Sequence, residues 1–167
     1  MPDLIHWRDD WLLEIPELDG EHREMVDLLN RLVRYQCCSE SHSSNISRFQ
    51  SDTAIIAMLE ELGRHVRRHF KHEEACMLEA AFPQYEDHCY EHMTLLAEYA
   101  ELVRDVRERG MQCLDEDTLA ALKGWLIGHI AGADGHFGEY HRRTRAGVLT
   151  RDREYFDRYW AGRASGN

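Results

Sequence analysis

The chain has 167 residues, about the length of one average domain, and 43% of them are hydrophobic, which allows a sizeable core and excludes intrinsic disorder. Acidic residues number 31 against 20 basic ones, and the resulting formal net charge of −11 disfavours binding to nucleic acid or to an anionic membrane surface. The 11 histidines are more than twice what an ordinary usage of ~2% gives.

Neither export nor membrane insertion is expected. No uncharged apolar run approaches the ~20 residues of a membrane-spanning helix, and the first ten residues lack the basic and apolar regions of a signal peptide. The five cysteines are odd in number and include no Cys-x-x-Cys pair, which argues against a disulfide framework or a thiolate zinc site. We therefore expect a cytoplasmic protein with reduced thiols and no nucleic-acid or membrane partner.

Apolar residues recur with a helical period in four segments, and none of the long segments alternates convincingly as a strand. The first helix is predicted to begin just after Pro16 with Asp19 as its N-cap, and to end before a polar loop at 39–45. The second is predicted to begin near Ser51 or Asp52. It should end at about residue 80, because the proline at position 83 prevents its continuation.

The third helix is predicted from about Gln84 to Arg109, where Gly110 takes the position after the C-cap. The fourth opens in the acidic cluster Asp115–Asp117, which suits a helix N-terminus. Four helices of ~20–30 residues joined by short loops predict an all-α, up-down-up-down four-helix bundle.

No internal repeat and no glycine- or serine-rich linker divides the chain, so a single domain is expected over residues 1–167. The bundle should occupy about 18–146, after an N-terminal arm at 1–17 and before a C-terminal tail at 147–167. A short terminal helix is expected in that tail, around Tyr155–Trp160.

Each of the four apolar stripes is interrupted by ionisable residues on its core face. These residues are His22, His69, Glu73, His88, His92, His129 and Asp134. An unpaired polar group costs a few (~2–7) kcal/mol to bury, and a charge costs far more. Seven such groups converging in a bundle predict a metal centre, because coordinate bonds replace the hydration that burial removes.

The spacing of these residues supports a shared site for most of them. Histidine and glutamate at 69 and 73, and the histidines at 88 and 92, are four residues apart and share a helix face. His129 and Asp134 are five apart, which separates them by ~140° on an ideal α-helix. A π-type turn among the nearby glycines would realign them; alternatively, Asp134 lies outside the site.

Five imidazoles and two carboxylates are too many donors for one tetrahedral zinc ion. They suit two borderline cations bridged by the carboxylates, and ligation without thiolate fits iron. The pattern is not ferritin-like, because that arrangement uses two Glu-x-x-His motifs and two further glutamates. The smaller number of carboxylates favours binding over oxidation chemistry.

The order of these residues resembles the hemerythrin family, and the bacterial hemerythrins (bacteriohemerythrins) in particular, over roughly residues 5–140. Two details depart from the family pattern: the first interhelical loop is longer, and Gly20-Glu21 replaces a commoner Glu-Gln pair. The matching segments are Trp7 with Ile15–His22, His69–Met77, Phe82–Pro83 followed by His88 and His92, and Trp125–Leu126 with His129–Ile130 and Asp134.

The resemblance implies a centre of two non-haem iron ions (Fe2+/Fe3+) with a bridging hydroxo or oxo ligand. One iron would be held by His88, His92 and His129, and the other by His22 and His69. Glu73 and Asp134 would bridge the two, and the second iron would keep a position open for O2. The implied apolar O2 pocket consists of Met25, Phe70, Trp125, Leu126 and Ile130.

The function that follows is reversible O2 binding by an oxygen carrier or storage protein that is not an enzyme. Two alternatives stay open: an oxygen or redox sensor module, and a di-iron enzyme that handles nitric oxide, peroxide or iron–sulfur repair. The other six histidines are not expected to be ligands. Among them, His65 lies one turn before His69; it is either a residue that supports the ligands from outside or a surface residue, and the second is favoured.

Overall fold

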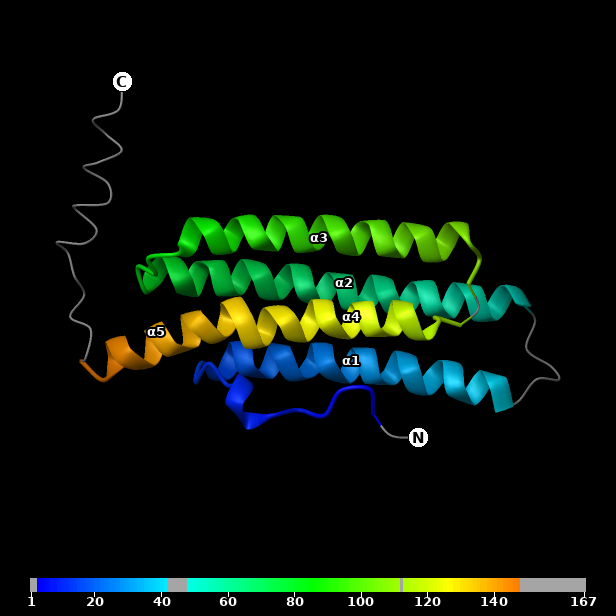
Figure 1. Cartoon of the computed structure of the whole chain (residues 1–167), viewed down its shortest axis with the longest axis horizontal. Coiled ribbons are helices and arrows are strands. Elements are labelled where there is room, and N and C mark those ends of the chain that lie inside the picture. Colours follow the sequence, from blue (N-terminus) through cyan, green and yellow to red (C-terminus); the bar gives the residue numbers. More distant parts are fainter. Residues whose placement is uncertain (1–2, 42–47, 112, 148–167) are drawn as a thin grey trace, which may run out of the picture.

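The computed structural model describes residues 3–41, 48–111 and 113–147, and every regular element in these ranges is helical (Figure 1). The long helices lie side by side and alternate in direction, which confirms the predicted all-α, up-down-up-down bundle. The elements are the 3-10 turn η1 (Asp9–Trp11), α1 (Pro16–Ser41), α2 (Arg48–Glu79), α3 (Tyr85–Glu108), α4 (Glu116–His129), the π-helical turn η2 (Ile130–Asp134) and α5 (Gly135–Arg145). The expected terminal helix at 155–160 lies outside the described residues.

The predicted start of the first helix is wrong. Helix α1 begins at Pro16, which is a favoured first helical position because proline lacks only an N–H that would be unpaired there. Asp19 lies in the first turn, where its N–H donates to the carbonyl of Ile15 over 2.9 Å. Its buried carboxylate accepts from the N–H of Leu13 over 2.7 Å, so it ties the N-terminal arm to the helix instead of capping it.

The loop between the first two helices also differs from its prediction. Helix α1 continues to Ser41 and α2 begins at Arg48, so both helices are longer than their apolar stripes indicated. The predicted N-terminus of α4 is confirmed, because the Asp115 carboxylate accepts from the N–H of Thr118 over 2.8 Å.

Away from the α2–α3 turn, the bundle interior is mostly apolar, and its buried amide side chains, Asn30 and Gln36, form hydrogen bonds with Ile5 and Leu114. Tyr99 is the one hydroxyl-bearing side chain in this main cluster of buried residues, and its O–H donates to the carbonyl of Leu59 over 2.6 Å. Apolar residues of all four periodic segments are buried as predicted. Those that are at most 2% exposed include Leu29, Leu32, Ile55, Leu59, Leu62, Val66, Val106 and Leu122.

A smaller cluster closes the bundle at the end where α2 turns into α3. It contains Leu13 from the N-terminal arm, Leu18, Met77, Phe82 and Phe137. Aromatic contacts hold it together, with the rings of Phe82 and Phe137 5.3 Å apart. Within the described ranges, no helix has the length and apolar character needed to cross a membrane.

Two helices end in the same hydrogen-bonded turn but with different residues at its left-handed position. At the end of α3, Gly110 has φ 58°, and the N–H of Met111 reaches back to the carbonyl of Val106. At the end of α2, Ala81 has φ 53°, and the N–H of Phe82 reaches back to the carbonyl of Met77. This motif favours glycine, because a Cβ is strained at positive φ.

We therefore expect Ala81→Gly to raise the free energy of unfolding by about 0.5–1 kcal/mol, since relief of the left-handed strain exceeds the added entropy of the unfolded chain. Gly110→Ala should lower it by about 1 kcal/mol for the converse reason. Urea unfolding of the two variants beside the parent protein measures both changes. Destabilisation by Ala81→Gly would contradict the strain at this position.

Candidate metal centre

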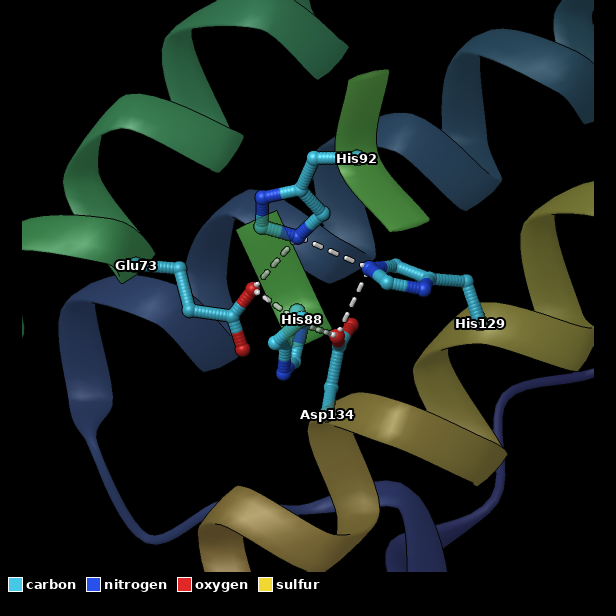
Figure 2. Close-up of side chains that lie close together, drawn as sticks. All are labelled: Glu73, His88, His92, His129 and Asp134. Carbon is cyan, nitrogen blue, oxygen red and sulfur yellow. Dashed lines mark hydrogen bonds and ion pairs between the residues drawn. The ribbon is translucent and has the colours of Figure 1, made fainter. Parts of the chain in front are cut away.

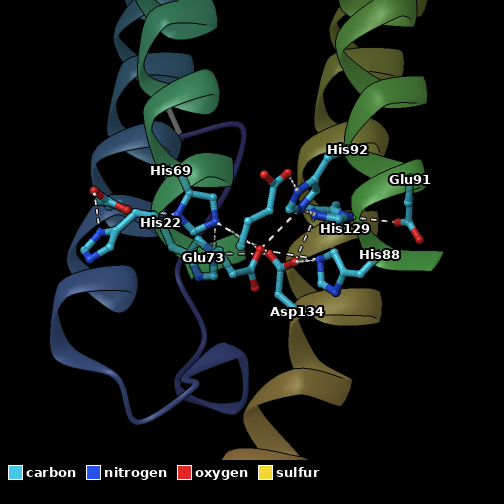
Figure 3. A network of polar contacts seen from close by, with 11 residues as sticks. His22, His69, Glu73, His88, Glu91, His92, His129 and Asp134 are labelled. Atoms are coloured by element: carbon cyan, nitrogen blue, oxygen red, sulfur yellow. Dashed lines mark hydrogen bonds and ion pairs between the residues drawn. The ribbon is translucent and has the colours of Figure 1, made fainter. Parts of the chain in front are cut away.

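All seven predicted ligand residues meet at one end of the bundle, close to the α2–α3 turn. Helices α1 and α2 contribute from one side and α3 and α4 from the other, and η2 contributes the last residue (Figure 3). Every one of the seven is at most 5% exposed, although each has a polar or ionisable side chain. The sequence pattern thus predicted which side chains the fold brings together, except that it left the place of Asp134 open.

The ligand atoms fall into two groups that share a carboxylate. In the first, Glu73, His88, His92, His129 and Asp134 each offer an atom within 4.8 Å of all the others (Figure 2). In the second, His22 and His69 do the same with Asp134. Each group could hold a metal ion, so the cluster has room for a pair of cations.

Both carboxylates lie between the two groups. The Oδ1 atom of Asp134 is 2.9 Å from His129 Nε2, and its Oδ2 atom is 3.2 Å from His22 Nε2. The Oε2 atom of Glu73 is 3.3 Å from His92 Nε2 and 3.9 Å from His69 Nε2. Each carboxylate is therefore placed to contact ions on both sides.

The π-helical turn decides the position of Asp134, which the sequence left open. Because η2 widens the helix over Ile130–Asp134, the aspartate and His129 lie on the same side of the chain despite their five-residue spacing. The first alternative from the sequence is confirmed, and Asp134 is fully buried at the centre of the cluster.

Three outer glutamates hold the imidazoles from behind. The Nδ1 atoms of His69, His92 and His129 lie 2.8–3.0 Å from carboxylate oxygens of Glu21, Glu74 and Glu91, in that order. A carboxylate only accepts, so each Nδ1 carries the proton, and in a neutral ring Nε2 then turns a lone pair to the site. Figure 3 shows Glu91 behind His129 in this arrangement.

These three glutamates were missed by the sequence analysis. Each is adjacent in sequence to a predicted ligand, at 21 beside 22, 74 beside 73, and 91 beside 92. Charged residues at such positions are ordinarily read as solvated helix faces. Adjacency to a core histidine or carboxylate is the signal that points to them.

The polar atoms of the cluster fit bound cations. The Nε2 atoms of His92 and His129 face each other at 3.0 Å, so two neutral rings would point lone pairs at one another. Among the described residues, both oxygens of Glu73 and the Nδ1 atom of His22 are buried without a hydrogen-bond partner. Buried polar atoms rarely stay unpaired, and a cation in the cluster would satisfy the Glu73 oxygens and separate the facing Nε2 atoms.

The titration behaviour of the metal-free cluster reflects the same crowding. Burial disfavours the charged form of His88, but the hydrogen bonds and charges of Asp134 and Glu73 outweigh it and raise its pKa to about 10. Burial likewise opposes ionisation of Asp134, and the positive charge and hydrogen bond of His129 hold its pKa well below the usual range. Without metal, protons on imidazole supply the positive charge that the carboxylates require.

Glu21 shows how strongly the outer carboxylates are held in the ionised form. The hydrogen bond from His69 is the main reason that its pKa falls to about 2, with His72 adding to the effect. His72 is half-exposed, and its Nδ1 lies 3.3 Å from Glu21 Oε1. His65 is half-buried beside Glu24 and Arg68 and does not belong to the clustered residues.

A small apolar cavity of about 10 Å³ adjoins the cluster. It reaches His69, His129 and Asp134 on its polar side. All five residues expected around an O2 pocket line it, together with Val66 and Leu95: Met25, Phe70, Trp125, Leu126 and Ile130. The indole N–H of Trp125 donates to the carbonyl of Leu95 over 3.1 Å, which joins α4 to α3 beside the cavity.

Comparison with known proteins agrees with this architecture. The family model described as the Hemerythrin HHE cation binding domain matches residues 13–140. A bacteriohemerythrin of Stenotrophomonas maltophilia is 26% identical over 160 residues, which cover 96% of this chain and 94% of that protein. A myohemerythrin of Theromyzon tessulatum is 22% identical over 134 residues, covering 80% of this chain and 91% of that protein.

Solved structures show the same fold. The crystal structure of wild-type hemerythrin superposes with a TM-score of 0.65 at 23% identity, covering 81% of this chain and 96% of that one. The bundle and its histidine–carboxylate cluster thus define a helical cation-binding protein. The family match extends over most of the chain, and the protein belongs to the hemerythrin family.

Metal binding should depend on pH in a defined direction. Because the pKa of His88 is about 10 in the metal-free protein, this imidazole is protonated at neutral pH, and a cation must displace its proton. The apparent affinity should therefore rise about tenfold per pH unit for each proton displaced. Anaerobic titration of the metal-free protein with Fe(II) in weak buffer, below and above neutrality, measures affinity and proton release together. Binding without proton release would contradict the protonated state.

Proposed function

We propose that this protein binds O2 reversibly at a non-haem di-iron centre, as an oxygen carrier or store. One observation carries the proposal: a buried cluster that fits two cations adjoins an apolar cavity large enough only for a very small molecule. Two ferrous ions held in the cluster would supply the electrons through which O2 binds and is released. The residues of the chain provide the ligands, the shape and the exclusion of water.

In this proposal, His88, His92 and His129 hold one iron, and His22 and His69 hold the other. Glu73 and Asp134 contact both. The grouping of the ligand atoms supports this division, because the first group has three imidazoles and the second has two. Residues of both groups line the cavity, but the second group has fewer donors, so this side of the centre is where a small ligand would bind.

The cavity walls favour reversible binding over turnover. Apart from the residues of the metal cluster, the cavity is lined by apolar and aromatic side chains, including Phe70 and Trp125. Phe70 also stacks on the His92 ring, with centroids 3.7 Å apart, so the wall is fixed to a proposed ligand. Water in the cavity would bring the protons that turn bound oxygen into released peroxide, and these walls exclude it.

The central test is reconstitution of the metal-free protein with Fe(II) under nitrogen, followed by iron counting and visible spectra through cycles of air and argon. Two irons per chain and a coloured form that disappears under argon are expected. Glu73→Ala should lose much of the iron because it removes a shared ligand, whereas Glu79→Ala, at an exposed position of the same helix, should retain it. Irreversible oxidation on first contact with air would overturn the proposal.

Enlarging the cavity should shorten the life of the oxygenated protein. Trp125→Ala removes an aromatic wall and should speed autoxidation severalfold, because water then reaches the site. Trp125→Phe keeps the apolar bulk while losing the hydrogen bond to Leu95, and it should stay near the parent rate. The decay of the oxygenated absorption band in air-saturated buffer measures the autoxidation rates. Equal rates for Trp125→Ala and the parent would show that Trp125 does not protect bound O2 from water.

A further inference from the structure

We propose that the N-terminal arm (residues 3–15) positions Asp134. In this proposal, which rests on the proposed role of Asp134 as a metal ligand, Leu13 of the arm seats against Gly138 of α5. This contact holds η2 in its π register and so keeps the Asp134 carboxylate oriented toward the site. Leu13 and Gly138 touch no metal ligand atom themselves; they act through the backbone of the turn.

The arm is fastened to the bundle at both of its ends. At one end, the N–H and the carbonyl of Ile5 form a pair of hydrogen bonds with the side chain of Asn30, at 3.0 and 2.8 Å. At the other end, the N–H of Leu13 donates to Asp19, and Arg142 of α5 donates to the carbonyl of Leu12 over 3.0 Å. Between these points the arm runs along α1, and η1 contacts η2 (Figure 1).

The contact between Leu13 and Gly138 leaves little room for a side chain on the glycine. Leu13 is completely buried, and a Cβ placed on Gly138 would lie 3.0 Å from both its Cα and its Cδ2 atoms. The Cα belongs to the backbone of the arm, so it cannot swing aside as the end of a flexible side chain does. The arm therefore favours glycine at the helical position that faces it, because a Cβ there would force the backbone of the arm to shift.

Helical register decides which residue occupies that position. A π turn adds one residue to the helix, so every residue after η2 is set back by one place, or about 100°, relative to an uninterrupted α-helix. If η2 relaxed to α-helix, Phe137 would take the place of Gly138 opposite Leu13. A phenylalanine side chain has no room where even a Cβ is too close.

The same change of register would move Asp134 out of the cluster. In an uninterrupted α-helix, Asp134 would lie about 140° around the axis from His129 instead of beside it. In the observed register, Phe137 is fully buried against Phe82, and Gly138 faces Leu13. The docking of the arm and the orientation of Asp134 toward the cluster thus both require the π register of η2. Each therefore stabilises the other.

A simpler interpretation is that Leu13 only fills the apolar cluster at this end of the bundle. Under that interpretation, disturbing the seat lowers overall stability but leaves η2 and metal retention no worse than an equally destabilising change elsewhere. The two interpretations differ in the local behaviour of η2, which amide hydrogen exchange measures without any metal.

The first experiment compares Gly138→Ala with Gly128→Ala in the full-length, metal-free protein. Apart from the helix's own backbone, no described atom lies within 4 Å of a Cβ at Gly128, which makes it the steric control on the same helical run, and Leu122→Ala in the main apolar cluster is the destabilising control. We expect amides 131–136 to exchange faster in Gly138→Ala only. Arg142→Met, which removes the donor to Leu12 without adding bulk at the seat, should act in the same direction. Exchange of these amides at the parent rate in Gly138→Ala and in Arg142→Met would overturn the proposal.

The second experiment measures how fast an excess of ferrous chelator removes Fe(II) from the reconstituted protein under nitrogen. Gly138→Ala should lose iron about tenfold faster than the parent, the size of effect typical of residues that orient a ligand. In an Asp134→Ala background the same substitution should add little, because its effect passes through that carboxylate. A tenfold faster loss of iron on adding Gly138→Ala to Asp134→Ala would show that the seat does not act through Asp134.

The two experiments separate this proposal from the proposed function. If Asp134→Ala releases iron at the parent rate, Asp134 is not a metal ligand, and the ligand assignment fails along with the metal-retention part of this inference. The exchange of the η2 amides in the metal-free protein still decides whether the arm holds the register.

Discussion

The structure depends on the burial of seven ionisable or polar side chains in the interior of a helix bundle. Water is excluded from them, and two of the seven are carboxylates whose ionised form is strongly favoured over the neutral acid. Such a cluster is stable only if positive charge lies among its oxygens and nitrogens. Protonated imidazole supplies that charge in the metal-free protein, and the donor set suits a pair of cations in its place.

The outer glutamates extend this constraint to the surface of the bundle. Glu21, Glu74 and Glu91 fix the orientation of three imidazoles and increase their basicity, so the rings are oriented for coordination before any cation arrives. They also add negative charge around the cluster. The same contacts that orient the rings therefore increase the demand for a cation at the centre.

The two ends of the bundle contribute differently to the stability of the protein. The end with Leu59, Tyr99 and Leu122 is apolar, and burial of its side chains supplies the hydrophobic stabilisation that folding needs. The other end contains the polar cluster, the π turn and the left-handed backbone at Glu14 and Ala81, all of which cost stability. The apolar end offsets these costs and lets the polar end keep a geometry that local propensity alone disfavours.

Local periodicity was sufficient to predict the four helices, their buried apolar faces and the clustered residues other than Asp134. An α-helix places residues four apart on one face whatever surrounds it, and this is why His69 with Glu73, and His88 with His92, were recognised from spacing. The helix ends at Gly110 and Asp115 were also predicted, because a left-handed residue and an N-cap each favour particular residue types. These features were determined by the sequence itself.

The tertiary structure decided what depends on partners distant in the chain. Asp19 has the residue type of an N-cap, but the arm brings the N–H of Leu13 to its carboxylate, and α1 begins at Pro16 instead. Asp134 had two possible positions, and α-helical spacing could not choose between them. In the proposal above, packing of α5 against the arm and the end cluster makes the choice, because the α register would place Phe137 opposite Leu13.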